Sequence, residues 1–381
     1  MSIQHEPITV KPISEVAKFK KNLIPTNIPD TYALNPMFEI IASEENIRKG
    51  VIAFRDFLYL FFDRLISDGH LYAKPPKKPS SMADYPFLHN ITNILVEIGY
   101  YSKPAEGGDS LLITEIPSCT VSTEENGKIK KPKIPFSNLI ECLRFLTLCG
   151  FGFNSFDLES KTLNISEAQP LEISYPNDPI LLTGLRALSV ADMELRTGRR
   201  YWNDNNLLRC DYRLLQAEDT DILDVLKDFL NPLPEKIQEF AVKLHQRYTD
   251  VGMTCVTIID GQYHFAYSHI KNSRRTLSSR DIYQLRVWEF AYSIKNGYCL
   301  FVRAKKTDKY TDIIEKFPSY LQEKIAKGYG CDRKLRNERC QGGCQGIRLT
   351  LDDSILNISE DIKTWLDSEV SYSLRDHSQS S

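Results

Sequence analysis

Two prolines separated by a single leucine, Pro232 and Pro234, divide the chain into parts with different sequence patterns. Proline has no backbone N–H and cannot continue a helix or a central strand, so such a pair is a strong break. The chain has 381 residues, and a single hydrophobic core rarely grows beyond about 250 to 300 residues. We therefore predict two or three domains, with the clearest boundary at these prolines.

The part after the prolines has the most regular pattern. Residues 235–251 predict an amphipathic helix, because their apolar side chains recur along one stripe. Two hairpins follow, with Asp-Gly at 260–261 and Asn-Gly at 296–297, and these residue types suit tight turns that need positive φ. Residues 309–328 predict a further helix. The pattern gives an α-β-β-β-β-α domain over residues 232–350.

The part before the prolines alternates helical and strand-like segments. Residues 1–34 carry several prolines and little periodicity, which predicts an extended lead-in. Residues 35–132 and 133–231 each contain apolar helices followed by hairpin-like segments, and this is the order of elements in a winged-helix unit. We therefore expect an α+β protein whose N-terminal half is helical with small hairpins, with a tandem winged-helix arrangement as one interpretation.

Two short stretches raise the question of an internal duplication. NILVEIGYYS (93–102) and RFLTLCGFGF (144–153) both contain an apolar helix end, a glycine and aromatic residues. A junction of helix, glycine and strand is common in unrelated proteins, so a chance match explains the similarity as well. The sequence leaves both interpretations open.

The net charge of −2 is distributed unevenly along the chain. Residues 1–232 hold 25 Lys+Arg and 31 Asp+Glu, residues 233–350 hold 21 and 12, and residues 351–381 hold 2 and 7. The balance of +9 in the middle segment favours an anionic partner. A solvated face that is neutralised by the acidic C-terminal helix and tail, residues 351–381, is the alternative.

The distribution of apolar residues bears on localisation. The first 21 residues carry charges and prolines where a secretion signal needs an apolar segment. The most apolar stretch, residues 51–66, is interrupted by four charged residues, which are costly at the centre of a bilayer. We expect a cytoplasmic protein without a membrane span.

The nine cysteines fall into two groups. Six are scattered, mostly among apolar neighbours, as expected of small buried side chains in a reducing compartment. The other three, Cys331, Cys340 and Cys344, lie close together among glycines. Neighbouring thiolates suit a soft metal ion, and zinc is the default choice. We therefore predict that these three residues are ligands of a structural Zn2+ ion.

A closed zinc site needs about four ligands, so one ligand must come from elsewhere in the same domain. Cys255, Cys299, His264 and His269 are the available candidates. The C-x3-C spacing at the end of the cluster also differs from the commoner C-x2-C. A merely reduced or redox-active cluster and a three-thiolate iron–sulfur site are therefore alternatives to zinc.

Basic residues are concentrated near this cysteine cluster and between the two predicted hairpins. Side chains of this kind grip phosphates, and neighbouring aromatic rings can stack on bases. The alternating Tyr263, Phe265 and Tyr267 are better explained as one core-facing side of a strand. The predicted nucleic-acid-binding residues, for DNA or RNA, are Arg274, Arg275, Arg280, Arg333, Lys334, Arg336 and Arg339.

The C-terminal region resembles a known group of sequences. The stretches LPEKIQEFAVKLHQRY, FPSYLQEKIAKGYGCDRK and CQGGCQGIRLTLDDSIL look like part of a family of uncharacterised proteins from clostridia-type bacteria with a C-terminal cysteine cluster. The resemblance covers about the last 130 residues and implies no known activity. Related-looking families carry further cysteines downstream, whereas this sequence has none after Cys344.

The sequence contains no recognisable catalytic motif. The patterns GxxxxGK[ST], HExxH and GxSxG do not occur, nor does GxGxxG after a strand. This makes an enzyme less expected, although a site assembled from distant residues leaves no linear motif. The first hypothesis is a regulatory nucleic-acid-binding protein with a structural metal site. A zinc-stabilised protein-interaction module and an enzyme or ligand-binding protein with a pocket in the C-terminal domain are the alternatives.

The cysteine spacing leads to a first prediction. Protein purified under reducing conditions should hold about one zinc ion per chain, and native mass spectrometry measures this directly. Removal of the ion by a chelator should lower the stability of the C-terminal region, because an ion cross-links residues that bury little apolar surface. A metal-free chain whose stability does not respond to the chelator would contradict the zinc site.

Overall fold

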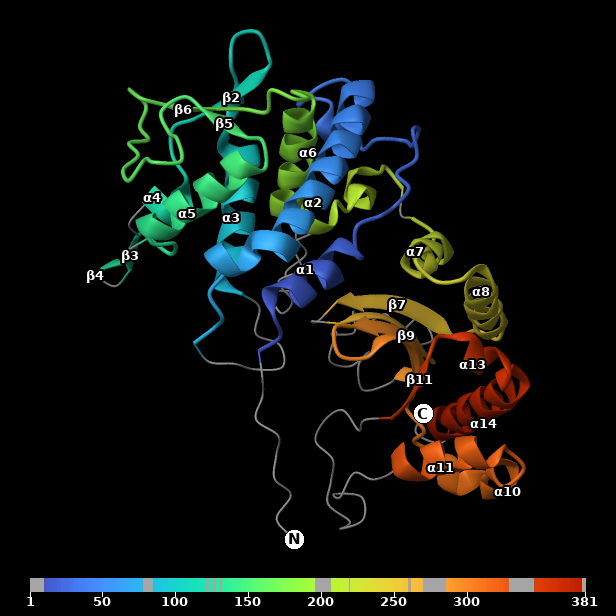
Figure 1. Cartoon of the computed structure of the whole chain (residues 1–381). Helices are drawn as coiled ribbons and strands as arrows, with labels where there is room; N and C mark the ends of the chain where they lie inside the picture. The colour runs from blue at the N-terminus through green and yellow to red at the C-terminus, as the bar shows by residue number, and fades with distance from the viewer. Residues whose placement is uncertain are drawn as a thin grey trace. The chain divides into compact units, whose positions relative to one another are not determined.

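A computed structural model gives the structure of the chain (Figure 1). It describes residues 10–77, 85–120, 123–125, 128–130, 132–195, 207–218, 220–259, 262–269, 286–328 and 346–378. The chain divides into two compact units, unit 1 (Met1–Thr220) and unit 2 (Asp221–Ser381). The N-terminal half is helical and the larger antiparallel sheet lies in the C-terminal half, so the α+β prediction is confirmed.

Unit 1 is built on tightly packed helices. They are α1 (Ile13–Lys21), α2 (Glu44–Tyr72), α3 (Pro86–Tyr101), α4 (Pro117–Thr120), α5 (Phe136–Leu148) and α6 (Leu181–Glu194), with short 3-10 turns at η1 (Pro36–Phe38), η2 (Leu207–Arg209) and η3 (Tyr212–Leu215). Helix α6 packs against both α2 and α3. A Cβ on Gly184 of α6 would lie 2.1 Å from the carbonyl oxygen of Gly50 in α2, so this crossing requires glycine.

A single small sheet joins the two halves of unit 1. Its strands are β1 (Lys103–Pro104), β2 (Ser110–Ile113), β5 (Gly152–Phe153) and β6 (Leu171–Ser174), in the order β1-β2-β6-β5, and a separate hairpin consists of β3 (Thr123–Glu125) and β4 (Lys128–Lys130). The central pair, β2 and β6, places Leu111 opposite Ile173. Each hairpin alone is too small to be stable. Segments 35–132 and 133–231 were predicted as separate units, but their hairpins share one sheet.

Two further features of unit 1 differ from the expectation. The extended lead-in predicted for residues 1–34 contains α1, because Pro12 precedes the first turn, where a proline is tolerated. Gly99 and Gly150, which align in the two similar stretches, have different roles. Gly150 follows α5 with φ of +102°. Gly99 lies inside α3, which continues to Tyr101, so the two glycines do not mark equivalent positions.

Unit 2 is a five-stranded antiparallel sheet with helices. The strands are β7 (Thr254–Ile259), β8 (Tyr263–Ser268), β9 (Arg286–Ser293), β10 (Gly297–Val302) and β11 (Ile347–Thr350), in the order β11-β10-β9-β8-β7. The helices are α7 (Ile222–Leu230), α8 (Glu235–Asp250), α10 (Thr311–Ile314), α11 (Ser319–Gly328), α13 (Asp353–Leu356) and α14 (Ser359–Ser378), with the 3-10 turn η4 (Thr307–Lys309). The two hairpins and their flanking helices were predicted, whereas β11 was not.

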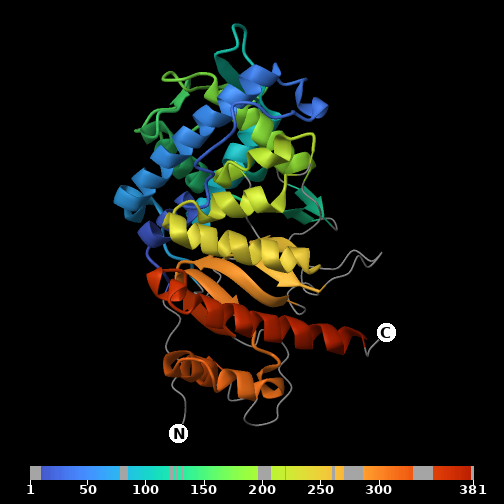
Figure 2. The ribbon, with the colours of Figure 1, turned by 90° about the vertical axis from the view of Figure 1, so that its right-hand side faces the viewer.

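One face of this sheet is an aromatic core. Figure 2 shows α8 and α14 in front of the sheet, and Arg247 of α8 forms an ion pair with Asp367 of α14 at 2.6 Å. The rings of Tyr267 and Trp288 stack at 3.7 Å between centroids. His245 of α8 is buried, with its Nδ1 2.8 Å from the Tyr267 hydroxyl oxygen, so it is a core histidine.

Helix α7 belongs to unit 2. The ring of its Phe229 lies 4.8 to 5.1 Å from the rings of Tyr263, Phe265 and Tyr298. The division between the units therefore falls before α7, between Thr220 and Asp221, rather than at Pro232. None of the described helices has both the length and the apolar character that a membrane crossing requires.

The packing of α7 leads to a second prediction. A fragment of residues 221–381 should unfold cooperatively, because it keeps α7, whose Phe229 packs against aromatic side chains of the sheet. A fragment of residues 232–381 should be less stable by about 3 to 5 kcal/mol, the usual cost of removing a buried phenylalanine side chain. Urea unfolding followed by circular dichroism measures both. Equal stability of the two fragments would contradict the assignment of α7 to unit 2.

Candidate functional site

The face of the sheet opposite α8 carries buried charges. Neighbouring side chains on a strand point to opposite faces, and Trp288 of β9 packs against Tyr248 of α8. Glu289, the next residue, therefore points to the other face. Its partners across the sheet are Ala266 on β8 and Phe301 on β10. Glu289 is fully buried at the centre of this face.

Three cationic or titratable side chains surround this carboxylate. Arg286 donates from Nη1 to Oε2 of Glu289 at 2.7 Å, and Arg303 donates from Nη2 to Oε1 at 2.6 Å. Nδ1 of His264 lies 3.3 Å from the same Oε2. All four residues are buried, and we call them the charged cluster. Their contacts connect β8, β9 and the residue that follows β10.

A β-bulge explains how Arg286 reaches Glu289. Residues three apart on a regular strand point to opposite faces. The register shifts between Tyr267 and Ser268, whose partners on β9 are Trp288 and Arg286, so Val287 is an extra residue. Such a bulge turns the strand locally and redirects a side chain. Arg286 thereby lies on the face of Glu289, an arrangement that residue spacing alone could not reveal.

The cluster keeps Glu289 ionised. Burial by itself raises the pKa of a carboxyl group, but the interaction with His264 and the charges of Arg303 and Arg286 outweigh burial and hold the pKa of Glu289 at about 2. A buried charge is tolerated when it is paired and hydrogen-bonded. Glu289 is therefore a fixed negative charge at neutral pH that orients two guanidinium groups.

Two arginines also lie against an aromatic ring on this face. The guanidinium carbon of Arg303 lies 3.9 Å from the centre of the Phe301 ring, and that of Arg348 lies 4.3 Å from it. Arg348 sits on β11 directly opposite Phe301. No described carboxylate lies within ion-pair distance of Arg348. This arginine is half-buried and lies against the ring, and a guanidinium group suits recognition of an anion.

Arg286, Arg303 and Arg348 lie at one end of the sheet. Ser268 pairs with Arg286, and Val302 pairs with both Trp288 and Ile347. The last residues of β8 and β10 and the first residues of β9 and β11 therefore meet at one end, which we call the arginine end. Gly346 fits closely there, since a Cβ on it would lie 2.0 Å from the carbonyl oxygen of Val302.

The residues predicted from the sequence lie outside the described residues. They are the metal ligands Cys331, Cys340 and Cys344 and the basic residues Arg274, Arg275, Arg280, Arg333, Lys334, Arg336 and Arg339. The described residues show where their segments join the sheet. The first segment leaves β8 and returns at Arg286, and the second returns at Gly346. Both junctions belong to the arginine end.

The four candidates for an additional metal ligand are not gathered at one point. Cys299 lies within β10, and His264 faces Glu289. Cys255 has its pKa raised to about 12 by burial, and its thiol interacts with Tyr267 on the aromatic side. His269 donates from Nε2 to the carbonyl oxygen of Val370 at 3.1 Å. Within the described ranges, no three His, Cys, Asp or Glu residues form a group that could hold a metal ion.

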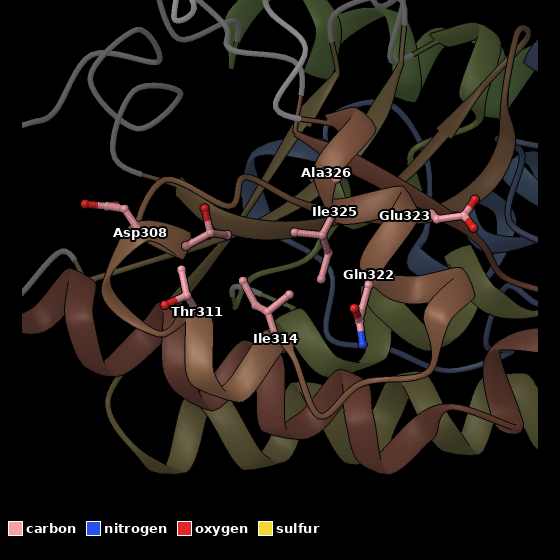
Figure 3. A pocket seen from close by; sticks show the side chains of 8 residues that line it. Asp308, Thr311, Ile314, Gln322, Glu323, Ile325 and Ala326 are labelled. Atoms are coloured by element: carbon pink, nitrogen blue, oxygen red, sulfur yellow. The ribbon is translucent and has the colours of Figure 1, made fainter.

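An open depression lies elsewhere in unit 2, between η4, α10 and α11. Its volume is about 620 Å³, and Ile314 and Ile325 contribute apolar side chains to it. The carboxylates of Asp308 and Glu323 point away from the centre of the depression (Figure 3). The polar groups therefore do not converge as they would around a substrate. Of the two sites, the arginine end carries the more specific chemistry.

Comparison of the chain with protein-family models, with curated proteins and with solved structures found no match. The resemblance of the C-terminal region to clostridia-type proteins stays a prediction. The function must therefore be inferred from the site itself.

The charged cluster leads to a third prediction. Glu289→Gln should lower the free energy of unfolding of unit 2 by about 3 to 5 kcal/mol at pH 7, because it removes a counter-charge that two buried guanidinium groups share. The wild-type advantage should be complete above the unfolded pKa of 4.5 and should be lost as the pH falls toward 2, since the folded pKa is depressed.

Urea unfolding between pH 2 and 7 measures this effect. Glu315→Gln, at an exposed position at the end of α10, is the matched control and should change stability little at any pH. A Glu289→Gln penalty that stays constant across the pH range would show that packing, rather than charge, accounts for the loss.

Proposed function

We propose that unit 2 binds nucleic acid through the phosphate backbone at the arginine end of its sheet. The observation that carries the proposal is the gathering of Arg286, Arg303 and Arg348 at the end where both basic segments join the sheet. The two segments that carry the seven basic residues predicted from the sequence rejoin the sheet at Arg286 and Gly346, next to these three arginines.

The described arginines have different parts in this proposal. Arg348 is half-buried and has access to a ligand. Arg286 and Arg303 are almost fully buried, so they raise the local positive potential without direct contact. A guanidinium group recognises phosphate through a planar, bidentate geometry. The contact of Arg348 with the Phe301 ring restricts its side chain before the ligand arrives, which reduces the entropy lost on binding.

The proposal includes a zinc ion. Cys331, Cys340 and Cys344 belong to the same segment as four of the predicted basic residues. An ion bound to these thiolates would cross-link that segment, and a cross-linked basic segment loses less entropy on binding than one without the cross-link. In this account the zinc ion has a structural role and takes no part in a reaction.

The proposed function leads to a fourth prediction. Wild-type protein should retain DNA or RNA in a gel-shift series at low salt, and the affinity should fall steeply with salt because each neutralised phosphate contributes about −0.9 to the log-log slope for duplex DNA. Arg348→Glu should weaken binding and reduce the slope by about one phosphate. The triple reversal of Arg274, Arg275 and Arg280 to Glu should weaken binding to all sequences alike.

Lys295→Glu is the matched control for Arg348→Glu. Lys295 is exposed in the turn between β9 and β10, at the opposite end of the sheet, and its substitution changes the net charge by the same amount as Arg348→Glu. This variant should bind as the wild type does. An equal loss with Lys295→Glu would show a diffuse charge effect. If the wild type retains neither DNA nor RNA, the protein-interaction module becomes the better account.

A further inference from the structure

The segment between β10 and α10 is held between two buried carboxylates. We call residues 303–310 the strap. Glu289 of β9 holds one end through Arg303, and the backbone N–H of Arg303 also donates to the carbonyl oxygen of Val287 at 2.9 Å. Glu369 of α14 holds the other part of the strap. The two carboxylates therefore connect the sheet, the strap and the C-terminal helix.

Glu369 accepts hydrogen bonds from three residues of the strap, although it lies far from them in the sequence. Its carboxylate accepts hydrogen bonds from the backbone N–H groups of Lys305 at 3.2 Å and Lys306 at 3.1 Å, and from the Tyr310 hydroxyl. The Tyr310 oxygen in turn accepts from the indole N–H of Trp365 at 3.0 Å. Glu369 and Tyr310 are each 1% exposed. The strap is thus fastened to α14 at Lys305, Lys306 and Tyr310.

The backbone of the strap cannot keep its shape unaided. Ala304 has φ of +46°, a left-handed conformation that residues with a Cβ seldom adopt and that persists only when the surroundings impose it. Ala304 lies between Arg303, which Glu289 holds, and Lys305, which Glu369 holds. Release of either carboxylate would let this residue return to a common conformation. That change would move the neighbouring Arg303.

We propose that Glu369 is a positioning residue for Arg303, so that the C-terminal helix α14 sets the geometry of the arginine end. The inference deepens the nucleic-acid-binding function proposed above and rests on it. Any event that lifts α14 from the strap would loosen Arg303 from Glu289 and from Phe301. The C-terminal helix is thereby a regulatory element, through which a change at α14 reaches the sheet face without touching the ligand.

A purely local role for Glu369 would look different. A carboxylate that accepts two consecutive N–H groups also stabilises a tight turn, and in that case its loss would affect only the amides of Lys305 and Lys306. The strap account requires the effect to continue through Ala304 to the Arg303 side chain. The two accounts therefore differ in one observable, the state of the Arg303 guanidinium group.

The test uses the full chain and three variants. Glu369→Ala removes the acceptor, and Tyr310→Phe removes a single hydroxyl as a milder change if the first variant folds poorly. Glu360→Ala, at an exposed position on the same helix, is the matched control. NMR measures two quantities in each protein: hydrogen exchange of the Lys305 and Lys306 amides, and protection of the Arg303 guanidinium protons, which a buried ion pair slows.

The strap account predicts faster amide exchange and lost guanidinium protection in Glu369→Ala, partial loss of both in Tyr310→Phe, and no change in Glu360→Ala. The affinity for a DNA or RNA oligonucleotide should fall roughly 3- to 10-fold in Glu369→Ala. That fall should disappear in an Arg303→Ala background, because coupled residues give non-additive effects.

Each outcome either supports or overturns the role of Glu369 as a positioning residue for Arg303. Faster amide exchange with an unchanged Arg303 guanidinium group overturns the proposal and leaves Glu369 as a local cap. Lost guanidinium protection in a protein whose wild type binds no nucleic acid supports the positioning role, while the proposed function alone fails. A fall in affinity that persists unchanged in the Arg303→Ala background overturns the coupling through Arg303.

Discussion

The contacts of the buried Glu289 carboxylate hold together the parts of unit 2 that form the candidate site. The carboxylate accepts hydrogen bonds from Arg286 and Arg303 and lies beside His264, so a single side chain ties β8, β9 and the strap together. Removing a charge from water is costly, and the cost is offset only when several partners are placed well. The bulge in β9 and the left-handed Ala304 follow from this requirement, because both bring an arginine to the carboxylate.

The features that sequence predicted well are local ones. The amphipathic pattern of α8 and the Asn-Gly turn between β9 and β10 each depend on a few neighbouring residues. Features that depend on distant partners were missed. Strand β11 pairs with β10 across a long connection, and β2 pairs with β6 across the predicted boundary at residue 133. The strand propensity of individual residues does not reveal which strands pair, because packing between distant parts of the chain decides it.

The candidate site shows the same limit. Glu289 could be noticed as a carboxylate near a strand, but its partners come from an irregular register and from the residue after another strand. The predicted basic and cysteine residues lie outside the described residues, so their roles stay predictions. The structure adds the described residues at which their segments join, and these share the arginine end with Arg348 and Phe301. This is why the site is placed on the sheet rather than at the open depression.

The central claim is that nucleic acid contacts the arginine end, and photo-crosslinking with a halogenated oligonucleotide followed by peptide mapping tests it most directly. The account predicts crosslinks to peptides that contain the junctions near Ser268, Arg286 and Arg348. It predicts none to the turn at Ser293–Gly297, which serves as an internal reference at the other end of the same sheet. Crosslinks confined to unit 1 or to that turn would contradict the account.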